Sequence, residues 1–165
     1  MFFSALFAVY FTLRALHVGP WPPEGDELEW WWRAITFTGL LVSSSGTMQM
    51  AVRAIARNDK KHFRLWVAAT MVLGIAFLFN QWALEWPSVP FSASSDAFGS
   101  LFFTMTGFHG AHVSGGIIAM AVILARSGAT RFGSEDLPTV EVVSYYWHFV
   151  DVVWVIMFGV LFFVK

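Results

Sequence analysis

The feature that most constrains this chain is a series of apolar runs, most of which are long enough for a helix to cross a membrane. A helix needs about 20 largely apolar residues to cross the hydrocarbon layer of a bilayer. The chain contains five apolar runs, of which the first is the shortest: residues 2–17, 31–52, 65–84, 97–125 and 140–164. The sequence therefore predicts an all-α fold, an integral membrane bundle of five transmembrane helices, with residues 1–165 forming a single domain.

The composition supports a membrane protein and argues against one class of partner. Only 13% of the residues are charged, against roughly 25% in an ordinary soluble domain, and 57% are hydrophobic. The 9 Trp and 18 Phe suit helices whose outer faces meet lipid and whose ends lie among headgroups. A net charge of −1 provides no basic field to hold nucleic acid, so we expect no nucleic-acid partner.

The distribution of Lys and Arg predicts how the chain is oriented. The connection formed by residues 53–64 holds five of the ten basic residues, and Arg126 and Arg131 follow the fourth run. The connections at residues 17–30 and 85–96 are acidic and contain Pro and Trp. Because cytoplasmic loops are enriched in Lys and Arg, we expect a cytoplasmic N-terminus and a periplasmic C-terminus.

Polar residues inside the apolar runs are the candidate functional residues. His109 and His112 lie three apart in the fourth run, close to Thr106. In the fifth run His148 precedes Asp151 by one helical turn, on the same face. A carboxylate at the centre of a membrane helix costs roughly 2.5–3.5 kcal/mol on insertion scales, so Asp151 needs a partner or water. A histidine of the fourth run can supply that partner if the two helices are in contact.

Three explanations of this cluster remain open at this stage. The first is axial ligation of haem or metal by His109 or His112 together with His148. The second is a proton relay, for which intramembrane His and Asp are the usual groups. The third is a non-catalytic hydrogen-bonded network that locks two helices together, and residue types alone favour it. Its members are Thr106, His109, His112, Tyr146, His148 and Asp151.

Two of these segments also resemble a known family. TGFHGAHVSGG (residues 106–116) and YYWHFVDVVW (residues 145–154) resemble the signatures of subunit III of haem–copper oxidases of the cytochrome c oxidase type. Further matches follow in the same order along nearly the whole chain: PWPPEGD (20–26), NDKKH (58–62), Gln81, Glu85, and Asp96 before FGSLFF (98–103). The chain matches the last five of the family's seven spans, as in the short bacterial form.

The resemblance implies a subunit with no catalytic site and no bound haem or copper, since those cofactors lie in partner subunits. It implies packing on subunit I, with subunit II and a respiratory supercomplex as further candidate partners, in the aerobic electron transport of a bacterial inner membrane. It also implies bound phospholipid, with Arg126 at a position that contacts a lipid phosphate. Family members carry a glutamate where this chain has Ala5, so the resemblance does not carry over the proton-related role of that carboxylate.

Other functions fit parts of the pattern. A subunit III-like protein of a nitric oxide reductase and the quinol oxidase form belong to the same superfamily. An independent membrane cytochrome of the b type, with haem between the fourth and fifth runs, represents a different class. A haem absorption band in the isolated chain would distinguish that class from the others.

Overall fold

The computed structural model describes residues 2–19, 21, 31–128 and 132–163. These residues form helices and no β-strand, which confirms the predicted all-α fold. The five α-helices are α1 (Phe2–Leu16), α2 (Trp31–Ala56), α3 (Lys60–Phe79), α4 (Ala97–Arg126) and α5 (Leu137–Phe163). A π-helical segment, Asn80–Glu85, continues α3, and a short 3-10 turn, Trp86–Ser88, follows it.

Three helical segments in the described part of the chain are long and apolar enough to cross a membrane. They are Lys60–Ser88, Ala97–Arg126 and Ser134–Phe163. Helix α1 is apolar but has only 15 residues, whereas α2 has 26 residues and is more polar in its middle, around the serines 43–45. The long apolar helices are those of a membrane protein.

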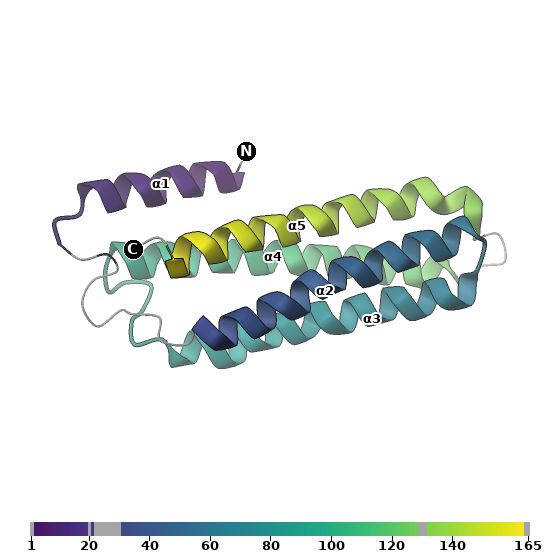
Figure 1. Cartoon of the computed structure of the whole chain (residues 1–165), viewed down its shortest axis with the longest axis horizontal. Coiled ribbons are helices and arrows are strands. Elements are labelled where there is room, and N and C mark those ends of the chain that lie inside the picture. Colours follow the sequence, from purple (N-terminus) through teal and green to yellow (C-terminus); the bar gives the residue numbers. More distant parts are fainter. Residues whose placement is uncertain (1, 20, 22–30, 129–131, 164–165) are drawn as a thin grey trace.

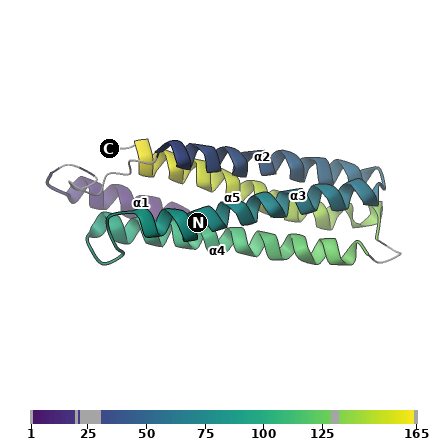
Figure 2. The ribbon, with the colours of Figure 1, turned by 90° about the horizontal axis from the view of Figure 1, so that it is seen from below.

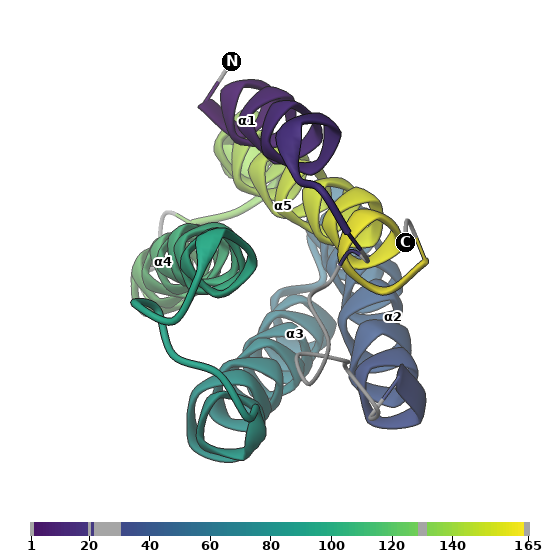
Figure 3. The same cartoon turned by 90° about the vertical axis from the view of Figure 1, so that its left-hand side faces the viewer.

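Helices α2 to α5 form a ring in which each packs on two neighbours (Figures 1 and 3). Helix α2 contacts α3 and α5, and α4 contacts the same two helices from the opposite side. Helix α1 lies outside this ring, against α4, and is shorter than the helices of the ring (Figures 1 and 2). The α2–α3 and α4–α5 connections lie at one end of the bundle, and the α3–α4 connection lies at the other (Figure 1).

A tryptophan of α5 occupies the centre of the ring. Trp147 is fully buried, and its indole Nε1 donates a hydrogen bond of 2.8 Å to Ser44 Oγ on α2. Its ring lies between Gly74 of α3 and Gly116 of α4, so closely that a Cβ at either position would come within 2.7 Å of a ring carbon. Glycine is required here because three helices approach one large side chain, which ties all four helices together.

A second tryptophan repeats this arrangement seven residues later on α5. Trp154 Nε1 donates to Thr38 Oγ1 of α2 over 2.9 Å. Its ring packs edge to face on Phe77 of α3, with centroids 4.7 Å apart, and against His109 of α4, with centroids 4.9 Å apart. Two successive layers of the core are therefore built around α5.

Side-chain caps set the starts of two helices. Asp59 accepts a hydrogen bond of 3.1 Å from the His62 backbone N–H, so α3 begins five residues before the apolar run that predicted it. Asp96 caps α4 in the same way through the Gly99 N–H at 2.6 Å. Asn58, with φ of 58°, ends the turn between α2 and α3, because asparagine tolerates the left-handed region.

Candidate functional site

Asp151 of α5 is hydrogen-bonded to α2. Its Oδ2 accepts a short hydrogen bond from Ser45 Oγ, and the same hydroxyl lies 2.8 Å from His148 Nδ1. A serine hydroxyl has a single proton to donate. Since Ser45 gives that proton to Asp151, the hydrogen bond to the imidazole requires His148 to carry a proton on Nδ1. Ser45 thus joins the two polar residues of α5 to each other and to α2.

This cluster lines an open groove between α2 and α5 of about 260 Å³. Apolar side chains form most of the groove: Val42, Val152, Val155 and Ile156, beside Ser45, His148 and Asp151. Asp151 is only 4% exposed, and its second oxygen, Oδ1, has no hydrogen-bond partner among the described residues. A buried acceptor without a donor is unfavourable, so Oδ1 adds to the cost of holding this carboxylate within the bundle.

His109 of α4 lies away from this groove, in the interior of the bundle. It is fully buried, and its ring lies against Trp154, Phe77 and Phe3, with centroids 4.9, 5.8 and 6.4 Å away. Neither ring nitrogen has a hydrogen-bond partner in the described part of the chain. Its contacts are aromatic packing contacts from α5, α3 and α1.

His112, one turn later on α4, faces the outside of the ring. Its Nδ1 lies 2.7 Å from the Phe108 carbonyl of its own helix, and its ring packs on Phe3 of α1 with centroids 5.1 Å apart. Its carbonyl accepts a hydrogen bond of 3.0 Å from the Tyr146 hydroxyl. Tyr146 and His112 therefore connect α5 to α4, through the backbone of His112 and not through its ring.

Thr106 is the centre of a third, separate group. Its hydroxyl donates a hydrogen bond of 2.7 Å to the Phe102 carbonyl and accepts one of 3.3 Å from Trp86 Nε1. Its carbonyl accepts a hydrogen bond of 3.0 Å from Gln81 Nε2. Gln81 belongs to the π-helical segment, a feature that often marks functional positions. These contacts join the end of α3 to α4.

The six residues of the predicted network thus fall into separate sites. The structure joins His148 to Asp151 and joins Tyr146 to His112, but among the described residues it places no α4 histidine on the Asp151 carboxylate. Asp151 pairs with α2 instead. Sequence reasoning missed Ser45, because it is one of three consecutive serines and the periodicity did not show which of them faces α5.

Arg126 ends α4 at the end of the bundle that carries the α4–α5 connection. Its Nη2 lies 3.2 Å from Asp136 Oδ1, and its side chain is 58% exposed. Arg131 lies outside the described residues. Ala5, on α1, is exposed.

Comparison with known proteins identifies the family. The profile of the family described as "Cytochrome c oxidase subunit III" matches residues 1–165. The chain belongs to this family. The family resemblance of residues 106–116 and 145–154 is therefore confirmed.

Similar proteins come from several groups of bacteria. A "probable cytochrome c oxidase subunit 3" of Mycobacterium tuberculosis is 43% identical over 168 residues, which cover 100% of this chain and 82% of the relative. A cytochrome c oxidase subunit 3 of Corynebacterium diphtheriae is 41% identical over 170 residues, with the same coverage. That of Thermostichus vulcanus is 36% identical over 163 residues, or 98% of this chain and 80% of the relative. As a member of the subunit III family, the chain is a membrane protein and part of an oxidase complex.

Proposed function

We propose that this subunit III is a non-catalytic component of a respiratory haem–copper terminal oxidase, which packs on subunit I and holds phospholipid. The family match over the whole chain supports this role. Subunit II and further subunits of a respiratory supercomplex are the other partners. The complex lies in a bacterial inner membrane and serves aerobic electron transport, with haem and copper held by the partner subunits.

The observation that carries the packing role is the groove between α2 and α5 that Asp151 lines. A carboxylate within a membrane span must be satisfied by protein or water, and among the described residues this one accepts a hydrogen bond only from Ser45. Asp151 lines an apolar groove between α2 and α5, together with Ser45 and His148, and a partner helix can dock along this groove. Gly39 and Ser43 are exposed on α2, and small residues allow another helix to approach closely.

The surroundings of the histidines support a haem-free subunit. The ring of His109 is enclosed by aromatic side chains from three helices. His148 lies in a different place, at the α2–α5 groove, with Nδ1 hydrogen-bonded to Ser45. Axial ligation by this pair needs both rings to face one iron, whereas here they face different surroundings.

Arg126 is proposed to contact a lipid phosphate. Its side chain is largely exposed at a helix end, and its ion pair with Asp136 uses one of the five N–H donors of a guanidinium. The planar fork of arginine matches phosphate oxygens well.

Co-purification tests the packing role. A tagged chain, solubilised in mild detergent, should bring down a haem-containing catalytic subunit. Asp151→Leu should insert into the membrane normally but recover much less of that subunit, whereas Val155→Leu, in the same groove, should recover nearly as much as the parent. Equal recovery by all three chains would exclude a role of Asp151 in docking. A Soret band retained by the isolated chain and lost in His148→Ala would show that it binds haem itself.

Protease accessibility tests the orientation. The five basic residues in the segment 53–64 support a cytoplasmic location of the α2–α3 connection. Cleavage of that connection in inside-out vesicles, but not in right-side-out vesicles, is the expected result. The opposite pattern would reverse the assignment of both termini.

A further inference from the structure

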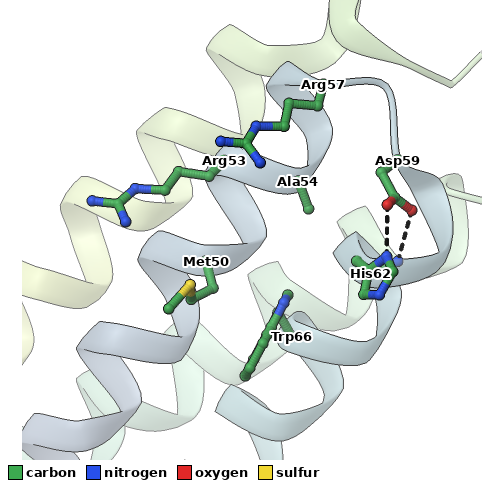
Figure 4. A pocket seen from close by; sticks show the side chains of 7 residues that line it. All are labelled: Met50, Arg53, Ala54, Arg57, Asp59, His62 and Trp66. Atoms are coloured by element: carbon green, nitrogen blue, oxygen red, sulfur yellow. Dashed lines mark hydrogen bonds and ion pairs between the residues drawn. The ribbon is translucent and has the colours of Figure 1, made fainter.

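A basic pocket lies at the end of the bundle where α2 meets α3 (Figure 4). Its volume is about 370 Å³, and its walls come from both helices and their connection. The lining residues are Met50, Arg53, Ala54, Arg57, Asp59, His62 and Trp66. The site is separate from the Asp151 groove and from Arg126, and none of the roles proposed above uses it.

Arg53 and Arg57 are one helical turn apart on α2 and are both exposed. Figure 4 shows their side chains extending in the same direction from the helix, away from Asp59 and His62. No carboxylate among the described residues lies within ion-pair distance of either guanidinium. The pocket therefore presents two forked, permanently charged donors that no described acid neutralises.

The other described arginines at this end of the bundle are engaged within the chain. Arg64 Nε donates to Ser127 Oγ over 3.0 Å, and its Nη2 donates to the Ser127 carbonyl, so it covers the end of α4. Arg126 pairs with Asp136. Arg53 and Arg57 differ from them because they line a cavity and have no fixed acceptor among the described residues.

The carboxylate that lines the pocket already has hydrogen-bond partners. Asp59 Oδ1 accepts from the His62 backbone N–H at 3.1 Å, and its Oδ2 lies 2.6 Å from His62 Nδ1 (Figure 4). The carboxylate is thereby held at the start of α3, on the opposite side of the pocket from the two guanidinium groups. An anion beside Arg53 and Arg57 does not have to displace it.

The remaining wall of the pocket is apolar. Met50 lies one turn before Arg53 on α2, and Trp66 lies one turn after His62 on α3, so both are farther from the connection than the charged residues. Trp66 is partly buried against the hydrophobic core. Charge at the helix ends, followed by an aromatic ring and a flexible apolar side chain, matches the change from headgroup to acyl chain at a membrane interface.

We propose that this pocket binds the phosphate headgroup of an anionic phospholipid, with Arg53 and Arg57 donating to the phosphate oxygens and Met50 and Trp66 contacting the apolar part of the lipid. Two guanidinium forks suit phosphate better than two ammonium groups, because each fork can donate two parallel N–H bonds. The proposal requires the membrane location of the chain but not its docking on subunit I.

Native mass spectrometry of the full chain, released from vesicles containing equal amounts of phosphatidylglycerol and phosphatidylcholine, tests this site. The parent chain should retain phosphatidylglycerol preferentially. Arg53→Gln/Arg57→Gln should reduce the retained phosphatidylglycerol about tenfold, as expected for the loss of about 1.4 kcal/mol or more of charge-assisted bonding. Lys60→Gln/Lys61→Gln is the matched control: it removes the same charge at the same end, but neither lysine lines the pocket.

Two further measurements make the outcome unambiguous. Arg57→Lys keeps the charge but loses the fork, so it should show an intermediate loss if the guanidinium geometry matters, and it serves as the test if the double variant does not fold. An excess of inorganic phosphate should not displace the lipid. Equal losses in the arginine and lysine variants would overturn the proposal, and so would displacement by inorganic phosphate, which would assign the site to a soluble anion.

Discussion

Replacement of Gly116 by alanine should destabilise the bundle, although alanine is the better helix former. The added Cβ would lie 2.7 Å from Trp147 Cε3 and 3.0 Å from Cζ3. The indole cannot easily move away, because its opposite edge lies against Gly74 and its Nε1 is hydrogen-bonded to Ser44. The strain must therefore be taken up by the separation of α4 and α5 or by loss of that hydrogen bond.

The expected magnitude follows from two opposing contributions. Overpacking of a tight core costs about 1–3 kcal/mol, whereas replacing Gly by Ala inside a helix gains about 1 kcal/mol. Gly39→Ala on α2 is the matched control, because a Cβ there meets nothing within 4 Å. Both variants gain the same helix propensity, so their free energies of unfolding should differ by the overpacking contribution, about 1–3 kcal/mol.

Reversible unfolding in mixed micelles, followed by tryptophan fluorescence and circular dichroism, measures this difference. A double-mutant cycle with Trp147→Phe checks the cause, because a smaller ring should relieve the strain and give a coupling free energy of about 0.5–3 kcal/mol. If Gly116→Ala is as stable as Gly39→Ala, or if the cycle gives no coupling, then Trp147 does not restrict the approach of α4, and the reasoning is wrong.

Three further predictions concern single side chains. His109→Phe should keep or raise the free energy of unfolding, because it removes two buried nitrogens that have no hydrogen-bond partner among the described residues; a loss above about 2 kcal/mol would show that the imidazole holds α4 in place. Arg126→Ala should reduce the anionic lipid that co-purifies with the oxidase, as quantified by mass spectrometry, and leave the initial turnover rate nearly unchanged. The hydrogen bonds from His62 lower the pKa of Asp59 below its ordinary value of 3.8. The cap of α3 should therefore be fully effective above pH 3.8 and be lost as the pH falls through the lowered pKa. Over that pH range, amide hydrogen exchange in the first turn of α3 should become faster in the parent chain. Asp59→Ala should not show this change, because it has no carboxylate to protonate.

The sequence predicted the number and order of the helices because apolar length is a local property. The ends of the helices were less predictable, since polar residues extend α2 to Ala56 and Asp59 starts α3 at Lys60, outside the apolar runs. A hydropathy pattern does not indicate a helical turn that lies outside the hydrocarbon layer, because the residues of that turn are polar.

The contacts of the polar residues could not be predicted from their spacing alone. The pattern placed His148 and Asp151 on one face, as observed, but it did not show that this face meets α2 and not α4, because the rotation of α5 is set by the fit of Trp147 between Gly74 and Gly116. The adjacent glycines 115 and 116 are a signal of close helix approach. They identify neither the helix nor the side chain that approaches.

The position of the two core tryptophans has a consequence for biosynthesis. Trp147 and Trp154 belong to α5, which leaves the ribosome after α1 to α4, yet they supply the side chains around which α2, α3 and α4 pack. Until α5 is inserted, the hydroxyls of Thr38 and Ser44 lack their indole donors, and Gly74 and Gly116 face no ring. Helices α2 and α3 can pair earlier, through Thr47 and Thr70 among others, but α4 lacks the rings that close the bundle, so a chain stalled before residue 147 should be an easy substrate for membrane quality-control proteases.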